Sequence, residues 1–202
     1  MQGFSRYVAL MLAVAGLTLA VAACSGSGGG GDSGDGDTAA YTNDTYGFSL
    51  TYDRQLTEGE PVEGTGAGGS SVFDVVFADK DGAVIADRYV DALQVSVYEL
   101  AREVKPSEVP GLKKELSGVV DQLMGSLATA KVVQPLEQIE VNGVPGFAFK
   151  YTYTEDDTEM TAVTFFLFNG KYEYQITAQA TTENWTQLKG KLETAVQTFA
   201  VK

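Results

Sequence analysis

The chain contains no histidine, and its only cysteine is Cys24. Without histidine, the Ser-His and Cys-His pairs of many hydrolases are excluded, and so are general bases built on imidazole. The same two shortages exclude an internal disulfide and a metal site with nitrogen or sulfur ligands. Only carboxylates, tyrosines, lysines and backbone groups are left for chemistry, so we expect no enzyme activity, no cofactor and no metal.

Basic residues are also scarce. Once Arg6 and the three aspartates Asp32, Asp35 and Asp37 are set aside, residues 40–202 carry 13 basic and 24 acidic side chains, a formal net charge of −11. A domain with this charge repels phosphate backbones and anionic lipids. We therefore expect no nucleic-acid partner.

The apolar run near the N-terminus, Val8–Ala23, has 16 residues, whereas a membrane-spanning helix needs about 20. Arg6 precedes the run and small residues end it, which is typical of an export signal. Val21-Ala22-Ala23-Cys24 resembles the lipobox of bacterial lipoproteins, and the resemblance implies that Cys24 receives a diacylglyceryl group and becomes the first mature residue. The alternatives are an ordinary signal peptide with a chance cysteine, or an uncleaved anchor.

Three segments follow from this interpretation: a lipoprotein signal peptide at 1–23, a lipidated Cys24 with a flexible tether at 24–39, and one folded domain at 40–202. Residues 25–38 have no apolar side chain and are rich in glycine, serine and aspartate. A coil of about 15 such residues spans roughly 20 Å, and paired acyl chains anchor a protein stably. The predicted location is the cell envelope, at the outer face of the cytoplasmic membrane, or at the outer membrane if the host has one.

Period-two and helical patterns divide the folded domain. Residues 46–52 alternate aromatic or aliphatic with small side chains and predict a half-buried strand, and strands are also expected within 71–78, 83–86 and 89–100. An amphipathic helix is predicted over 110–130 and a second over 182–200, with Thr182 as its N-cap.

Between these helices the sequence predicts strands joined by Asn-Gly turns at Asn142-Gly143 and Asn169-Gly170. Alternation around the second turn gives two apolar faces, one with Leu167, Tyr174 and Ile176, the other with Phe166 and Phe168 beside Glu173 and Gln175. A sheet that is apolar on both faces needs cover on both sides. The predicted fold class is therefore α+β, an αβα sandwich in which helices cover both faces of an antiparallel sheet.

Several stretches also carry a family resemblance. "YGFSLTYD", the central amphipathic helix, "VNGVPGFAFKYTYT", "FNGKYEYQITAQAT" and "WTQLKGKLETAVQTF" occur in an order that resembles PsbP-like domains, which include many small bacterial lipoproteins. The resemblance covers nearly all of residues 41–202. It implies the αβα sandwich and a role in binding and assembly, and it carries over no functional residues, because the matching positions are core, turn and cap residues.

Three polar motifs have simpler interpretations than a site. Gly64–Gly69 spells G-x-G-x-x-G, but a strand pattern follows it where the dinucleotide fingerprint requires a helix. Asp79–Gly82 lacks the downstream glutamate of a calcium loop, so a turn explains it better. Glu155, Asp156 and Asp157, with Glu159 nearby, could hold Ca²⁺, but we favour a solvated hairpin tip.

The aromatic residues leave one candidate for ligand binding, a pocket beneath the first helix lined by Phe147, Phe149, Tyr151, Tyr172 and Tyr174. Most aromatic residues fall at core-facing positions, where sheet packing already accounts for them. The leading hypothesis is a membrane-anchored, non-enzymatic binding or assembly module with a protein partner in the envelope. The alternative is a carrier of a small apolar or lipidic ligand between sheet and helix.

Overall fold

The computed structural model describes residues 37–202, so the predicted signal peptide, Cys24 and most of the tether lie outside the described residues. The first strand begins at Thr38, two residues before the predicted start of the domain. Neither of the two α-helices in the described part has the length and apolar composition that a membrane crossing requires. In chain order, the elements are β1 (Thr38–Asn43), β2 (Phe48–Asp53), β3 (Leu56–Glu58), β4 (Val62–Glu63), β5 (Phe73–Asp79), β6 (Val84–Ile85), β7 (Arg88–Tyr89), β8 (Ala92–Val104), α1 (Lys113–Ser126), β9 (Lys131–Val141), β10 (Val144–Glu155), β11 (Thr158–Thr181), α2 (Thr182–Gln197) and β12 (Ala200–Val201).

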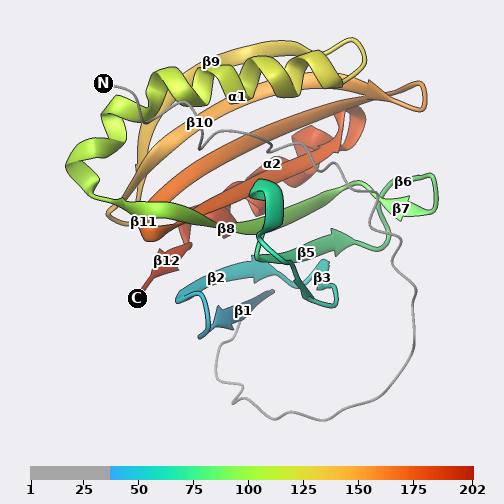
Figure 1. Ribbon diagram of the computed structural model, residues 1–202. Coiled ribbons are helices and arrows are strands. Elements are labelled where there is room, and N and C mark those ends of the chain that lie inside the picture. Colours follow the sequence, from blue (N-terminus) through green and yellow to red (C-terminus); the bar gives the residue numbers. More distant parts are fainter. Residues whose placement is uncertain (1–36) are drawn as a thin grey trace.

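The main sheet is antiparallel in every strand pair, with the order β3-β5-β8-β11-β10-β9 and β4 beside β5. Helix α1 covers one face of this sheet, and α2 lies against the other (Figure 1). The predicted α+β sandwich is therefore confirmed.

Both Asn-Gly dipeptides lie at reversals of the chain. Asn142 and Gly143 have φ angles of +47° and +82°, as a two-residue hairpin turn requires, and Val141 pairs with Val144 beside them. Within β11, the first arm pairs with β10 and the second with β8, and the hydroxyls of Thr164 and Thr177 are 3.1 Å apart. The chain thus folds back near Asn169-Gly170, so that β11 supplies two neighbouring arms of the sheet.

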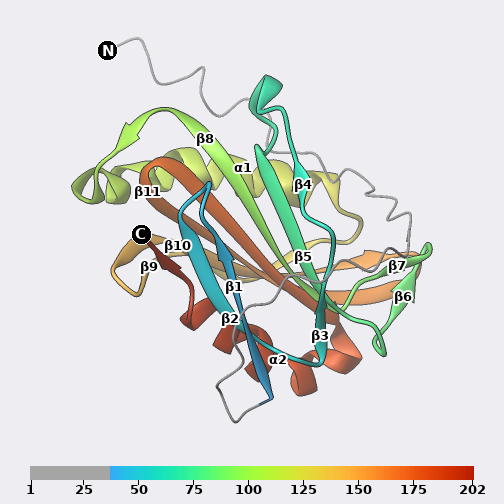
Figure 2. The ribbon, with the colours of Figure 1, turned by 90° about the horizontal axis from the view of Figure 1, so that it is seen from below.

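A second, three-stranded sheet has the strand order β1-β2-β12. It lies beside α2, on the side of the main sheet that α2 covers (Figure 2). Its buried side chains include Phe48 and Leu50. Together with side chains of α2 and of one face of the main sheet, they form the larger core cluster. Thr198, just after α2, accepts a hydrogen bond from the Thr51 amide at 2.9 Å and donates one to its carbonyl oxygen at 3.0 Å. The end of α2 is thereby held to β2.

The helices differ from the prediction at their ends. A 3₁₀-helix, Pro106–Leu112, precedes α1, and α1 ends at Ser126. Because the next residues must enter β9 at Lys131, the expected helix up to residue 130 is too long. The N-cap of α2 is Thr181, whose hydroxyl accepts from the Asn184 amide, so the prediction of Thr182 is wrong by one residue. The predicted apolar stripe from Trp185 to Phe199 is buried.

Candidate functional site

The five aromatic residues of the predicted pocket do not come together. Phe147, Phe149 and Tyr151 are buried beneath α1, whereas Tyr174 is buried on the opposite side of the sheet, where Tyr172 packs against the same cluster. The division follows from the alternation of β11, which directs Tyr172 and Tyr174 to the face of Leu167 and Ile176. The ring of Phe149 stacks on those of Tyr151 and Phe166, with centroids 4.9 and 6.0 Å apart. Aromatic side chains therefore fill the space under α1 around Phe149.

The acidic tip is a tight turn between β10 and β11. Asp156 and Asp157 adopt φ angles of +44° and +63°, and Glu155 forms an ion pair with Arg88 of β7. Among residues 37–202, no group of three or more histidine, cysteine, aspartate or glutamate side chains is arranged to hold a metal ion. The Gly64–Gly69 loop lies between β4 and β5 and contains only a three-residue 3₁₀ turn, Ala67–Gly69.

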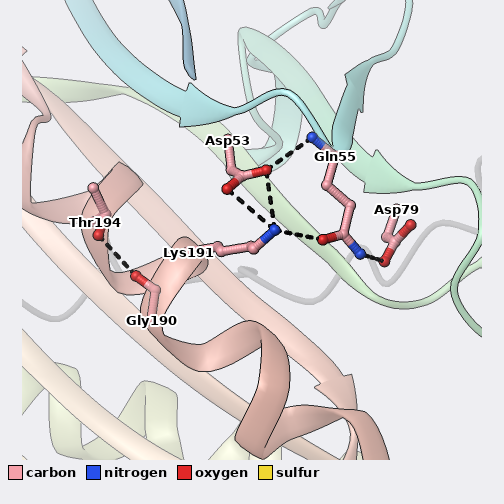
Figure 3. A network of polar contacts seen from close by, with 6 residues as sticks. All are labelled: Asp53, Gln55, Asp79, Gly190, Lys191 and Thr194. Atoms are coloured by element: carbon pink, nitrogen blue, oxygen red, sulfur yellow. Dashed lines mark hydrogen bonds and ion pairs between the residues drawn. The ribbon is translucent and has the colours of Figure 1, made fainter. Parts of the chain in front are cut away.

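Asp79, from the calcium-like tetrapeptide, belongs to a polar network that joins three elements (Figure 3). Its carboxylate accepts a hydrogen bond from the Gln55 side chain at 2.6 Å, and the Gln55 amide oxygen accepts one from Lys191 of α2 at 2.6 Å. Lys191 also pairs with Asp53 at 3.2 Å. The network ties α2 to the ends of β2 and β5, so its role is structural.

Two other carboxyl groups are buried, and they differ in how their hydrogen bonds are satisfied. Asp91, with 0 % of its surface exposed, accepts from the Thr181 and Ala83 amides at 2.8 and 2.9 Å and from the Asn184 side chain at 2.7 Å. By contrast, Glu173 of β11 is 4 % exposed, and its Oε1 has no hydrogen-bond partner in the described chain. Because an unpartnered buried acceptor is costly, Glu173 marks the more unusual site.

Glu173 belongs to a group of polar side chains on the α1 side of the main sheet. We call this group the polar face; its members are Asp74 of β5, Ser96 and Tyr98 of β8, and Glu173 and Gln175 of β11. Each alternates along its strand with residues of the core cluster under α2, so all five point to the other side. Register places Tyr98 opposite Glu173, and Ser96 opposite both Gln175 and Asp74.

Within the polar face, Asp74 and Ser96 have hydrogen-bond partners. Asp74 accepts from the hydroxyls of Ser71 and Ser96, and Gln94 donates to Ser96 at 3.0 Å. On β11, by contrast, the side-chain oxygen of Gln175 is buried without a hydrogen-bond partner, like Oε1 of Glu173. Two neighbouring acceptors on β11 therefore lack donors in the described chain.

Burial dominates the electrostatics of this cluster. Removal from water raises the pKa of Glu173 from 4.5 to about 8, so the carboxyl holds its proton at neutral pH. Burial, followed by the nearby charges of Asp74 and Glu173, also raises the pKa of Tyr98. Both groups stay uncharged near pH 7 and can donate or accept hydrogen bonds. The arrangement is suited to binding a polar group.

Sequence reasoning placed Glu173 and Gln175 on the face of Phe166 and Phe168 but did not single them out. The signal in the sequence was that Glu173 stands in a predicted strand between two aromatic residues, Tyr172 and Tyr174. Its importance depends on burial and on missing hydrogen-bond donors, which are set by the residues around it in space. No local pattern in the sequence marked Asp91, because the three groups that donate hydrogen bonds to its carboxylate belong to residues 83, 181 and 184.

The three layers, with an antiparallel sheet closed by one helix on each side, define an αβα-sandwich domain of the PsbP type. The chain belongs to the PsbP family, whose sequence model matches residues 36–201. The resemblance of residues 41–202 to PsbP-like domains is therefore confirmed. A comparison with curated proteins finds no match.

Solved structures show the same fold at low sequence identity. Cyanobacterial PsbP (CyanoP) from Synechocystis sp. PCC 6803 is similar with a TM-score of 0.57 at 16 % identity, over 87 % of this chain and 98 % of that chain. LpqN of Mycobacterium tuberculosis, described as involved in cell envelope biogenesis, gives a TM-score of 0.53 at 8 % identity, over 82 % and 90 % of the two chains. A Bacteroides thetaiotaomicron protein gives 0.51 at 12 % identity, over 81 % of this chain and 48 % of the other.

Proposed function

We propose that this protein is a lipid-anchored, non-enzymatic binding or assembly module of the cell envelope. In this proposal, Cys24 carries the lipid, the glycine-rich segment after it serves as a tether, and the PsbP-family domain binds a protein partner outside the cytoplasmic membrane. The membrane is contacted through the acyl chains only, because the acidic domain is repelled by anionic lipid.

The observation that carries the proposal is the way both sides of the sheet are filled. Phe147, Phe149 and Phe166 are at most 1 % exposed beneath α1, and Phe48, Ile176 and Leu192 are equally enclosed on the α2 side. A small-molecule carrier places its ligand in a cleft lined by such residues. Here the aromatic and aliphatic side chains pack against one another, which favours binding at the outer surface.

The chemical inventory supports a non-enzymatic role. The chain has no histidine and no cysteine besides Cys24. The most perturbed carboxyl, Glu173, neighbours Tyr98, Ser96 and Gln175, and its pKa is raised by burial alone. These groups form hydrogen bonds but offer no activated nucleophile. LpqN, which is described as involved in cell envelope biogenesis, supports the proposed location only through the likeness of its fold.

A second candidate function is a carrier of a small ligand beside α1. The observation that favours it is the pair of unpartnered acceptors on Glu173 and Gln175, since a ligand with hydrogen-bond donors would satisfy them. Such a ligand would lie beside the aromatic residues under α1, so it could also be partly apolar.

The experiment that tests the proposal is crosslinking and affinity capture of the full chain from its own membranes, with mass spectrometry of proteins and small molecules. An assembly module should yield one dominant protein partner, and that purified partner should raise the melting temperature of the domain. A carrier should instead gain thermal stability from a lipid extract. Capture of neither a protein nor a small molecule would contradict both candidates.

A further inference from the structure

Exposed hydrophobic side chains are few and are not spread evenly. Among the described residues, the large ones are Val84 at 56 %, Tyr89 at 39 %, Val132 at 47 % and Val133 at 52 % exposure. Val84 and Tyr89 are a cross-strand pair on the β6–β7 hairpin, so their side chains lie on the same face of it. Val132 and Val133 lie at the start of β9. Single exposed hydrophobics are ordinary, but a gathering of them marks an interaction surface.

All four residues lie at one end of the sandwich. Val132 pairs with Tyr151, near the end of β10, and Arg88 of the β6–β7 hairpin pairs with Glu155, the last residue of β10. Figure 1 shows the hairpin, the β10–β11 turn and the end of α1 together at the right of the molecule. Figure 2 shows the hairpin and that turn at the same end.

The last turns of α1 add apolar surface at this end. Leu116, Val119 and Val120 are its buried residues, whereas Leu123 and Met124 are only partly buried, as is Leu127 directly after the helix. The segment after α1 is fixed to β10, because the Thr154 amide donates to the Ala128 carbonyl at 3.0 Å. We call the whole region the apolar end; it consists of Val84, Tyr89, Leu123, Met124, Leu127, Val132 and Val133.

Carboxylates border the apolar end. Six acidic residues belong to its turns and strand ends, against three basic ones, of which Arg88 is already paired with Glu155. The acidic residues are Asp81, Asp87, Glu155, Asp156, Asp157 and Glu159, and the basic residues are Lys80, Arg88 and Lys131. An apolar centre with a polar rim is the usual arrangement of a protein–protein interface, and here the rim is acidic.

We infer that the apolar end is the docking surface for an envelope protein with an apolar depression bordered by lysine or arginine side chains. This inference deepens the proposed function and rests on it. Tyr89 is the expected anchor, since tyrosine is enriched among residues that dominate binding. Charge complementarity selects this occupant: a second copy would bring two acidic rims together, and an anionic bilayer would be repelled.

The test places a photo-crosslinking amino acid in the full, membrane-bound chain at Tyr89, at Val132 or, as a control, at Ser107. Ser107 is exposed in the 3₁₀-helix after β8. The end of β8 pairs with Gly170 at the other reversal of β11, so this position lies at the opposite end of the sheet. We expect Tyr89 and Val132 to crosslink to the same protein, on a peptide with Lys or Arg beside apolar residues, and Ser107 not to.

Two double variants probe the apolar and charged parts separately. Val84→Ser with Tyr89→Ser should reduce the Val132 crosslink about tenfold or more, because it removes the expected anchor. Asp156→Asn with Asp157→Asn should reduce the crosslink several-fold at low salt and much less at high salt. Asparagine also tolerates positive φ angles, so the turn is kept. Glu99→Gln with Glu103→Gln, on exposed β8 positions, is the matched control and should have no effect.

The outcomes separate this inference from the proposed function. Crosslinks to a second copy of this chain, to lipid, or to an acidic peptide would overturn the inference. A protein captured only from Ser107, or one that is insensitive to the Val84 and Tyr89 changes, would also overturn it and leave the proposed function standing. If no position captures a protein, both fail.

Discussion

Replacing Glu173 by glutamine should stabilise the domain at neutral pH. In the unfolded chain this carboxyl titrates near 4.5, and in the folded protein burial raises its pKa to about 8. At pH 7 folding must therefore take up a proton, which costs up to 1.36 kcal/mol for each pH unit above 4.5. The free energy of unfolding of the variant should exceed that of the wild type by about 3 kcal/mol at pH 7.

The pH dependence follows from the sign of the shift. Below pH 4.5 the glutamate is protonated in both states, so burial carries no ionisation penalty. Between pH 4.5 and 8 the folded state binds more protons than the unfolded state, and stability falls as pH rises. Above pH 8 the penalty levels off at about 5 kcal/mol. Glutamine keeps the size and polarity of the protonated side chain and has no proton to lose, so its curve should lack this decline.

The assay is urea denaturation of residues 37–202 at pH values from 4.5 to 9, followed by the fluorescence of Trp185. The matched control is Glu99→Gln, an exposed position on the neighbouring strand, which should change stability by less than about 0.5 kcal/mol. Parallel curves for wild type and Glu173→Gln between pH 5 and 8 would refute the reasoning, because they would mean that Glu173 is charged in the folded protein.

Three further outcomes are expected. Cys24→Ser should leave the protein soluble or as an uncleaved precursor, because the thiol that would accept lipid is gone; detergent partitioning like that of the wild type would contradict this. Asp91→Asn should lower the free energy of unfolding by about 3 kcal/mol or more, since either orientation of the amide places an NH₂ group against a donor; a urea melt measures it. Trp185→Ala should cost about 3–5 kcal/mol because the indole is 7 % exposed, whereas Trp185→Phe, which removes the unpartnered N–H, should cost much less; because Trp185 is the only tryptophan of the chain, these two melts are followed by circular dichroism.

Local patterns in the sequence predicted the main elements well. The alternation from Phe48 to Tyr52, the Asn-Gly dipeptides and the stripe from Trp185 to Phe199 each depend on residues a few positions apart, and each led to the observed element. The errors were at the ends of the helices. The N-cap of α2, for example, is Thr181 and not the predicted Thr182, because the cap depends on the direction of the preceding chain.

The candidate sites were harder to predict. Tyr172 and Tyr174 were grouped with Phe147 as one pocket, although the alternation of β11 sends them to the other side of the sheet. The apolar end joins Val84, Tyr89 and Val132, which are far apart in the sequence. No local signal marks such a surface, because it arises from which strand ends meet.

The sequence by itself therefore determined the αβα class, the acidic surface, the absence of histidine chemistry and the lipobox-like context of Cys24, since these depend on composition and short-range periodicity. Only the tertiary structure decided which carboxyl groups are satisfied. Asp91 finds three donors from distant segments and is fully hydrogen-bonded, whereas Glu173 is buried without a partner for Oε1 and keeps its proton. The physical reason is that desolvation and hydrogen bonding depend on neighbours in space, which periodicity does not specify.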